Sequence, residues 1–388
     1  MPWSVWSVVE QRSQFCAEVL ESGISISVAC RAFGVSRKTG YKWLGRYLEK
    51  GASGLVDQSR RPRHSPQRLS KELEDYVVGI KREYPYWGPR KIHRLASREC
   101  LEIEAVSVST ISRVLARYGL VTTREEPVIY PAVGRFERSN PNELWQMDLK
   151  VAVSRNRGPR VWVAGLLDDH SRYALGLWFL SDLSDERVLS CWIKAVRRYG
   201  LPGQTLTDHG AQFGMEDYAT SAFRTYLWAC KVQHIQGRVG HPQTQGKIER
   251  FWRTFKCELT PQLESSSPEL WPGLMERWRE QYNTIRPHES LGDSPPSSRY
   301  QSSSKPFVEP DCSQKIGKPD SIYRRVSPKG QMSLGGQRHM VGRGLRGWMV
   351  EVRSQGNGCW HVYFRHHFVR EIILTKPVES VTYVPVQV

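Results

Sequence analysis

The sequence contains no long apolar run and no closely spaced pair of cysteines. The longest apolar stretches, near residues 161–167 and 173–180, are far too short to cross a bilayer, which takes roughly 20 apolar residues. The eight cysteines are scattered without a Cys-x-x-Cys pair, which argues against a disulfide framework and a zinc knuckle. No charged segment followed by an apolar run opens the chain, so we expect no signal peptide and a reducing, cytoplasmic environment.

Acidic residues are the minority charge in this chain. There are 39 Asp+Glu against 56 Lys+Arg, which gives a formal net charge of +17 and an isoelectric point near 9.6. Such an excess favours a polyanionic partner, nucleic acid first, and carries no information about the fold. With 388 residues the chain is too long for one ordinary core, and we expect about two to four domains.

The first part of the chain is predicted to be helical. A short helix that Ser27 can cap is followed by a turn at Gly34-Val35 and a second helix that Ser36 can cap. This is the layout of a helix-turn-helix unit, whose second helix enters the DNA major groove with its first residues. A solvated face on an all-α domain is the alternative. The candidate DNA-binding residues of the second helix are Arg37, Lys38, Thr39, Tyr41 and Lys42.

Two glycines, Gly40 and Gly45, stand inside this predicted recognition helix, and each should cost it about 1 kcal/mol relative to alanine. The helical part is followed by a Pro/Ser segment without periodicity that carries Arg60, Arg61 and Arg63. Arginines on such an arm suit the narrow DNA minor groove, so we include them among the candidate DNA-binding residues. A solvated linker is the alternative interpretation.

Residues 67–120 are predicted to form a second helical unit. Apolar residues recur there at helical spacing, and residues 109–119 have the pattern of a helix that is capped by Ser109 and ended by Gly119. Arg90, Lys91 and Arg94 lie between these segments. We therefore expect this unit to bind DNA as well.

From about residue 141 the pattern changes to strands alternating with helices. The strand segments are rich in Val, Leu, Trp and Tyr and are bounded by turn residues. The predicted order β-β-β-α-β-α-β-α is that of an RNase H-like α/β core. The expected segments are strands at 144–151, 160–167 and 172–180, a helix from 184, a strand at 205–207, a helix at 222–231, a strand at 232–236 and a helix from about 244.

The last part of the chain has short β-like runs separated by glycines. Residues 313–388 hold twelve Lys/Arg and four Asp/Glu, so we expect a small β domain that touches DNA, with a capping or dimerising module as the alternative. The Ser/Pro-rich stretch 290–305 is interpreted as linker. The predicted architecture is multidomain: an all-α helix-turn-helix domain at 1–56, a basic linker at 57–66, a second helical DNA-binding domain at 67–120, a linker at 121–140, an α/β RNase H-like catalytic core at 141–300, a linker at 301–320 and a β-barrel-like domain at 321–388.

Three acidic residues stand in distinctive local sequences. Asp148 is expected on a strand, Asp208 at the exit of a short strand, where α/β sheets present functional groups, and Glu249 on a helix. Lys256 follows Glu249 by seven residues and so lies on the same helix face, where it can hold a DNA phosphate. Carboxylates placed in this way can bind a pair of Mg²⁺ ions, which stabilise the attacking and leaving oxygens of a phosphodiester displacement.

The sequences around these acids resemble the catalytic-core motifs of the DDE transposase/retroviral integrase superfamily, and most closely those of bacterial insertion-sequence transposases. The likeness covers roughly residues 10–300. It implies that Asp148, Asp208 and Glu249 are catalytic and bind two Mg²⁺ ions, for which Mn²⁺ can substitute, and that Lys256 is the basic residue that follows the glutamate. The motifs that carry the likeness are Trp145–Asp148, Thr207–Phe213, His241–Phe251, Asp168–Tyr173 and Tyr282–His288.

The resemblance implies a DNA transposase that binds the terminal inverted repeats of an insertion sequence and catalyses strand cleavage and strand transfer. The expected partners are double-stranded DNA, at the element ends and at the target, and at least one further copy of the chain. No membrane association is expected, and the expected location is the bacterial cytoplasm, at the nucleoid. Two alternatives stay open: a non-catalytic DNA-binding regulator derived from a transposase, and an RNase H-like nuclease acting on RNA–DNA hybrids. The nuclease would have no need of helix-turn-helix units, which suit the B-form major groove.

Two further groups of polar residues have structural interpretations. Asp168 and Asp169 are expected to close a strand and to organise the following turn, with Arg172 as partner. Near Cys359 the sequence places three histidines whose spacing fits no common structural zinc pattern, so we interpret them as polar positions on strands. These histidines are His361, His366 and His367.

Overall fold

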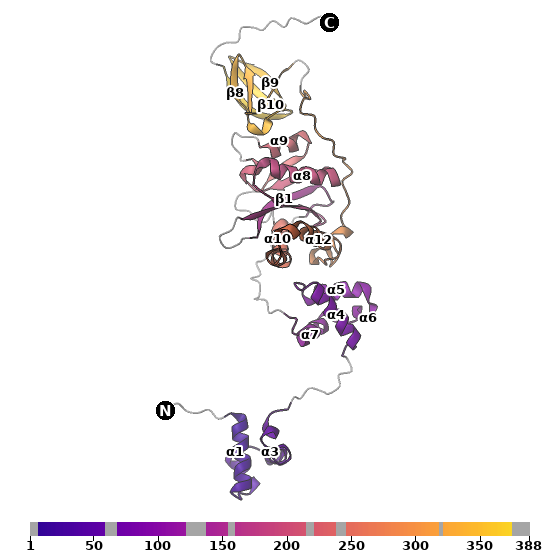
Figure 1. Ribbon diagram of the computed structural model, residues 1–388, viewed down its shortest axis with the longest axis vertical. Helices are drawn as coiled ribbons and strands as arrows, with labels where there is room; N and C mark the ends of the chain where they lie inside the picture. Colours follow the sequence, from indigo (N-terminus) through magenta and orange to yellow (C-terminus); the bar gives the residue numbers. More distant parts are fainter. Residues whose placement is uncertain are drawn as a thin grey trace, which may run out of the picture. The chain divides into compact units, whose positions relative to one another are not determined.

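The computed structural model of the protein describes residues 7–58, 68–121, 137–153, 160–214, 221–237, 246–317 and 321–374 (Figure 1). The chain divides into two compact units, Met1–Ser70 and Lys71–Val388. None of the described helices combines the length and the apolar character that crossing a membrane requires.

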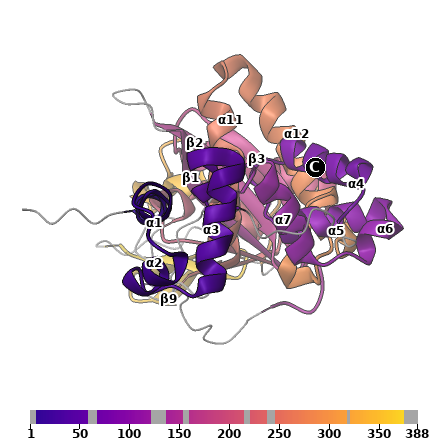
Figure 2. The ribbon, with the colours of Figure 1, turned by 90° about the horizontal axis from the view of Figure 1, so that it is seen from below.

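The first unit is a small helical domain (Figure 2). Its helices are α1 (Val8–Glu21), α2 (Ile26–Ala32) and α3 (Arg37–Lys50), followed by the 3-10 helix η1 (Gly51–Leu55). The turn between α2 and α3 passes through Gly34 at a φ of 62°, a left-handed conformation that glycine adopts without strain. The predicted helix-turn-helix order is confirmed. The predicted cap at Ser27 is wrong, because α2 already begins at Ile26 with Ser25 at its N-cap.

Gly40 is explained by the close packing of these helices. A Cβ atom at this position would lie 2.4 Å from Cys30 Sγ and 2.9 Å from Phe15 Cζ. Only glycine therefore lets α3 approach α2 and α1 this closely, and the packing offsets the low helix propensity. A Cβ atom at Gly45 would have no other atom within 4 Å. Close packing therefore does not offset the low helix propensity of this second glycine.

The second unit begins with four helices: α4 (Lys71–Glu83), α5 (Pro89–Glu99), α6 (Leu101–Glu104) and α7 (Val108–Arg117). Apolar residues such as Val77, Ile92 and Ile111 are fully buried among them. The cap of α7 is Ser107, whose hydroxyl accepts a hydrogen bond from the Thr110 N–H at 3.2 Å, so the expected cap at Ser109 lies two residues too late.

The central part of the second unit is a five-stranded mixed sheet with the strand order β3-β2-β1-β4-β5. The first three strands are antiparallel neighbours, whereas β4 runs parallel to β1 and β5 parallel to β4. The expected RNase H-like order of strands and helices is confirmed. The strands are β1 (Leu144–Val153), β2 (Val161–Asp168), β3 (Ala174–Leu180), β4 (Gln204–Thr207) and β5 (Gln233–Gln236).

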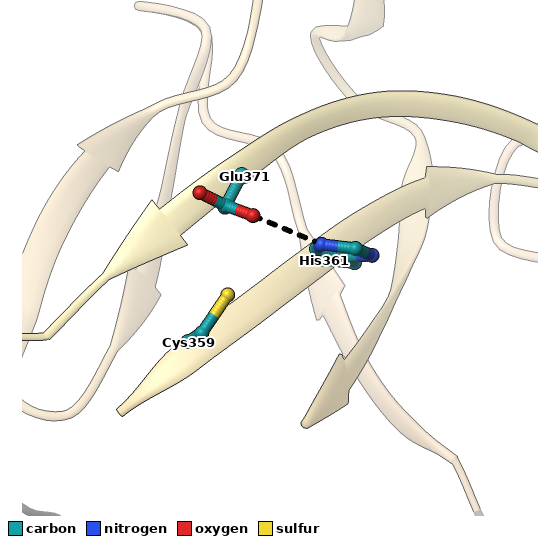
Figure 3. A group of neighbouring side chains, drawn as sticks. All are labelled: Cys359, His361 and Glu371. Atoms are coloured by element: carbon teal, nitrogen blue, oxygen red, sulfur yellow. Dashed lines mark hydrogen bonds and ion pairs between the residues drawn. The ribbon is translucent and has the colours of Figure 1, made fainter. Parts of the chain in front are cut away.

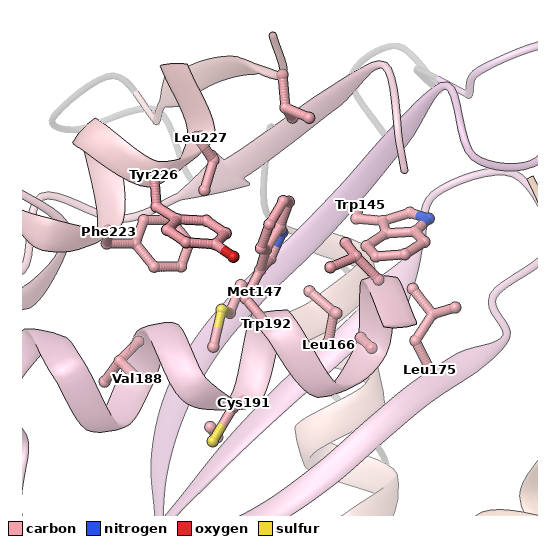
Figure 4. Close-up of a cluster of buried hydrophobic side chains, with 14 of the residues drawn as sticks. Trp145, Met147, Leu166, Leu175, Val188, Cys191, Trp192, Phe223, Tyr226 and Leu227 are labelled. Carbon is pink, nitrogen blue, oxygen red and sulfur yellow. The ribbon is translucent and has the colours of Figure 1, made fainter. Parts of the chain in front are cut away.

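Helices cover both faces of this sheet, as Figure 1 shows for α8 and α9 on one side of β1 and α10 and α12 on the other. On the first face Trp145 and Met147 of β1 pack with Trp192 and Phe223 of the helices (Figure 4). On the second face Val163 and Leu177 pack with the aromatic residues of α10 and α12. The helices are α8 (Asp185–Tyr199), α9 (Ala222–Ala229), α10 (Gly246–Glu258), α11 (Thr260–Glu264) and α12 (Trp271–Thr284).

The Ser/Pro-rich stretch after α12, which we expected to be a linker, is bonded to the core. Ser303 N–H donates to the Tyr199 carbonyl at 2.8 Å, and the Lys305 carbonyl accepts from Leu201 N–H at 2.8 Å. Tyr300 stacks on Tyr173 with ring centroids 4.2 Å apart. Serine and proline are compatible with a segment that packs along a domain surface without regular structure, and composition alone does not distinguish the two cases.

The last described part forms a small antiparallel β domain. A four-stranded sheet of order β11-β10-β9-β6 and the hairpin β7-β8 share one apolar core, which also contains Ala229 of α9. His367 stacks on Trp228 of α9 with centroids 4.1 Å apart, so this β domain packs against the core. The strands are β6 (Ile322–Arg325), β7 (Gln331–Leu334), β8 (Gln337–Met340), β9 (Met349–Gly356), β10 (Cys359–Phe364) and β11 (His367–Ile373).

Candidate active site and nucleic-acid interface

Asp148 lies in the middle of β1, on the face of the sheet that α10 covers. Side chains alternate along a strand, and Met147 and Leu149 belong to the opposite face. β1 and β4 are parallel, with Gln146 opposite Leu206. Asp148 lies two positions after Gln146, and Asp208 lies two positions after Leu206. The two carboxylates therefore lie side by side at the end of β4.

The electrostatics of Asp148 agree with this geometry. Burial raises the pKa of the Asp148 carboxyl to about 6, the Leu149 N–H at 2.8 Å from Oδ1 opposes that effect, and the negative charge of Asp208 raises the pKa further. Asp208 is oriented by the Gly210 N–H, which donates to its Oδ1 at 3.0 Å. The two carboxylates are partly buried and repel one another. A hard divalent cation such as Mg²⁺, which prefers oxygen ligands, would neutralise this repulsion.

Helix α10 crosses the sheet beside Asp148 because a glycine lies beneath it. Gly165 on β2 is the cross-strand partner of Asp148. A Cβ atom at Gly165 would lie 2.6 Å from Cζ2 of Trp252, so the indole rests on the bare backbone there. The sequence interpretation missed both residues, although the glycine inside a buried strand signals a close approach.

Glu249 and Lys256 lie on α10 and are exposed. Glu249 precedes Trp252 by three residues, which places it one turn earlier on the same side of the helix. In the part of the chain that the structure describes, the carboxylates of Asp148, Asp208 and Glu249 do not all come within 4.8 Å of one another. The structure thus brings the two aspartates together, and the metal-binding role of Glu249 stays a prediction.

The first turn of α10 is held by Gln146, which lies two positions before Asp148 on β1. Gln146 accepts from the Ile248 N–H at 3.3 Å and donates to Asp169 at 2.7 Å. Lys247 Nζ lies 2.5 Å from the other oxygen of Asp169. Gln146 therefore ties α10 to β1, which positions the helix that carries Glu249.

Asp168 and Asp169 have the structural role expected for them. The Arg172 N–H donates to the Asp168 carbonyl at 3.0 Å, and the Arg172 guanidinium donates to the Asp169 carbonyl. Asp168 also accepts from the Asn142 N–H at 3.2 Å. The expectation that these acids organise a turn with Arg172 is confirmed.

The motif Tyr282–His288 also has a structural explanation. Asn283 accepts from the Ala174 N–H at 2.8 Å and donates to the Ala174 carbonyl at 3.0 Å, which joins α12 to the start of β3. Arg286 pairs with Glu258 of α10 at 2.9 Å, and both side chains are nearly buried. This motif holds the helices of the second face in place.

In the first unit the predicted recognition helix presents most of its candidate residues to solvent. Arg37, Lys38 and Lys42 are exposed, and Tyr41 keeps 62% of its surface exposed. Thr39 is different, because its N–H donates to the Ser36 hydroxyl at 3.2 Å and completes the helix cap. Arg60, Arg61 and Arg63 lie outside the described residues.

The arginines of α5 make contacts that the sequence did not reveal. Arg90 and Arg94 form ion pairs with Asp293 at 3.0 and 3.2 Å, and Arg98 donates to the Asp293 carbonyl at 2.7 Å. Asp293 belongs to the segment after α12, and its side chain is only 7% exposed. These arginines, which lie in the helical unit that we expected to bind DNA, attach the four-helix segment to the core.

Comparison with known families agrees with the helix-turn-helix order of the N-terminal region and with the α/β fold of the core. Homeodomain-like domain models match residues 8–56 and 39–115, and integrase core domain models match residues 138–242 and 230–296. The chain therefore contains an integrase core domain behind an N-terminal homeodomain-like helix-turn-helix region. Proteins similar to this chain include transposases of bacterial transposons and insertion sequence elements.

Two relatives and one solved structure illustrate the similarity. The chain is 25% identical over 266 residues to the transposase for transposon Tn552 of Staphylococcus aureus, a match that covers 62% of this chain and 53%, about half, of that protein. It is 24% identical over 380 residues to a putative transposase for insertion sequence element IS5376 of Geobacillus stearothermophilus, covering 94% of this chain and 87% of that one. The catalytic core of HTLV-2 integrase, solved in complex with magnesium, is 15% identical with a TM-score of 0.35 and covers 42% of this chain and 99% of its own.

Proposed function

We propose that this protein is a DNA transposase that binds the terminal inverted repeats of an insertion sequence and catalyses Mg²⁺-dependent strand cleavage and strand transfer. The observation that carries the proposal is the position of Asp148 on β1 and of Asp208 directly after the parallel neighbouring strand β4, on a core that α10, the helix with Glu249, covers. We assign DNA-end recognition to residues 1–56 and 67–120, catalysis to 141–300 and a supporting role to 321–388. The protein would act in the bacterial cytoplasm, at the nucleoid.

Asp148, Asp208 and Glu249 would hold two Mg²⁺ ions, and Mn²⁺ would substitute for them. Bound metal would stabilise the charge that develops on the attacking and leaving oxygens of the phosphodiester. Asp148 and Asp208 would supply oxygen donors from the sheet, while the contact of Trp252 with Gly165 would hold α10, which carries Glu249, against that sheet. Lys256, exposed two turns beyond Glu249, would bind a DNA phosphate. No covalent link to the protein is required, since water and then a DNA 3′-hydroxyl are the nucleophiles.

Substitution of the three acids tests the catalytic assignment. Asp148→Asn, Asp208→Asn and Glu249→Gln should each abolish cleavage of end-labelled DNA from the flanks of the protein's own gene, while end binding survives. The matched control is Glu264→Gln, another exposed carboxyl close to α10, which should keep wild-type activity. Near-normal cleavage by any of the three variants would remove that residue from the site. End binding by a wild type that never cleaves would favour the non-catalytic regulator.

The first residues of α3 are proposed to read the element ends. Alanine at Arg37, Lys38 and Lys42 should weaken specific binding, by about 1–3 kcal/mol for each residue that contacts a base edge. Lys50→Ala, at the far end of the same helix, is the control and should leave the footprint unchanged. An unchanged footprint in the triple variant would move recognition to residues 67–120.

Arginines 60, 61 and 63 are proposed to follow the DNA backbone or minor groove. Alanine at Arg60, Arg61 and Arg63 should lower the slope of log affinity against log salt by about one per lost phosphate contact, with little change in sequence preference. A loss of sequence preference with an unchanged salt slope would contradict this assignment.

The active species is proposed to contain at least two copies of the chain. Transposition joins two DNA ends to one target, and each core has one set of the three acids, so two cores must meet, most simply with two-fold symmetry. Protein–DNA complexes sized in solution during end joining should contain at least two chains. Joining by complexes that contain a single chain would refute this claim.

A further inference from the structure

Three side chains of the C-terminal β domain converge on one point, away from the acids of the core. Cys359 and His361 lie two positions apart on β10, and Glu371 is the cross-strand partner of His361 on β11. Their ligand atoms all lie within 4.8 Å of one another, and this is the only such group among the described residues. Figure 3 shows the three side chains on one side of the two strands, with the His361–Glu371 contact dashed.

The backbone explains why these residues meet. Positions i and i+2 of a strand share a face, and a directly opposed pair on the neighbouring strand brings its side chains together. The antiparallel ladder between β10 and β11 thus fixes all three Cβ atoms without help from a flexible loop. His361 Nε2 lies 3.1 Å from Glu371 Oε2, a separation that suits two ligands of one small cation.

The donor set selects the class of metal. Thiolate, imidazole and carboxylate are together ligands of Zn²⁺, whereas Mg²⁺ prefers oxygen alone. We propose that Cys359, His361 and Glu371 form a zinc site with three protein ligands and a fourth position open to water or to an external donor. This site is separate in place and in chemistry from the magnesium-binding acids of the core.

The surroundings of His361 favour this role. Its other ring nitrogen, Nδ1, lies 3.4 Å from the Tyr363 hydroxyl, and a second hydrogen-bond partner of this kind commonly orients a metal-bound histidine. Phe368 packs edge-on against the imidazole with ring centroids 5.1 Å apart. The bound ion joins β10 to β11 beyond their backbone bonds.

Cobalt(II) is the probe for this site, because a Co²⁺–thiolate bond gives a charge-transfer absorbance that carboxylates alone do not give. The full chain, without a polyhistidine tag, is titrated with CoCl₂ in excess MgCl₂, which occupies the acids of the core. The wild type should take up a single equivalent with this absorbance, and ZnCl₂ should remove it. ZnCl₂ should also raise the thermal unfolding midpoint.

Cys359→Ser and His361→Gln should each lose the charge-transfer absorbance and the zinc-dependent rise in midpoint, with unchanged far-ultraviolet circular dichroism. Cys257→Ser removes an exposed thiol of α10 and should retain both signals. Absence of the absorbance in the wild type, or its persistence in the Cys359→Ser protein, would overturn the proposal. These readouts do not depend on transposition, so they remain informative if the catalytic assignment fails.

Discussion

Asp148→Asn is expected to stabilise the metal-free protein while it abolishes cleavage. Burial first, and the charge of Asp208 in addition, raise the pKa of the Asp148 carboxyl from 3.8 to about 6. Between pH 3.8 and about pH 6 this carboxyl is protonated in the folded protein but ionised in the unfolded chain. The free energy of unfolding therefore falls as the pH rises through this range. Above it, keeping the carboxylate ionised costs folding about 2–3 kcal/mol, at about 1.4 kcal/mol per pKa unit. Asparagine removes that cost because it carries no charge.

Urea unfolding of the wild type and the Asp148→Asn variant measures this effect. Without metal the variant should be more stable by about 1–3 kcal/mol at about pH 8, and the advantage should shrink by about 2 kcal/mol at about pH 4.5. Addition of Mg²⁺ should raise the unfolding midpoint of the wild type and leave that of the variant unchanged, because a ligand stabilises only the state that binds it.

Asp168→Asn is the matched control for the magnesium effect. Burial raises the pKa of Asp168 to about 6 as well, but this carboxyl accepts from the Asn142 N–H and organises a turn. The control should therefore keep the magnesium-dependent rise in midpoint. If Asp148→Asn instead destabilises the metal-free protein at about pH 8 by about 1 kcal/mol or more, Asp148 is a structural carboxylate and the reasoning is wrong.

Three further changes test packing that the structure revealed. Gly165→Ala should reduce cleavage at least about tenfold with end binding intact, since a Cβ there meets the indole of α10 at 2.6 Å and displaces the helix; equal rates would contradict this. Asp293→Ala should lower the free energy of unfolding by about 1–3 kcal/mol, because it removes the buried carboxylate that pairs with both Arg90 and Arg94. The control Glu289→Ala removes only the exposed second ion pair of Arg90 and should cost less than about 1 kcal/mol. Gly40→Ala should destabilise the first unit in thermal unfolding, whereas Gly45→Ala should stabilise it by up to about 1 kcal/mol, and the opposite order would refute the packing argument.

The helices and strands of the core could be predicted from local sequence because their signals are local. Alternation of apolar residues marked β1, and Ser36 marked the start of α3, where it caps the helix. Two helix caps were predicted at the wrong serine: Ser25 and Ser107 open their helices where Ser27 and Ser109 had been expected. Several serines lie close together at these positions, and the backbone selects among them. Such errors move a boundary without changing the fold.

The candidate site was predictable in part. The short sequences around Asp148 and Asp208 pointed to the two acids, and the structure places them side by side. Trp252 was not predictable, because its position depends on a glycine that lies more than eighty residues earlier and on a different strand. The pairing of α5 with Asp293 was missed for the same reason, since a basic residue has the same local appearance whether it binds DNA or a buried carboxylate.

The sequence by itself determined the order of elements, the excess of positive charge and the chemical identity of the candidate ligands. Tertiary structure alone decided which of these residues meet. The parallel register of β1 and β4 puts Asp148 and Asp208 on one face, and a slip of one residue would separate them. The antiparallel register of β10 and β11 gathers Cys359, His361 and Glu371 in the same way. Register depends on packing between segments distant in the chain, and local sequence does not specify it.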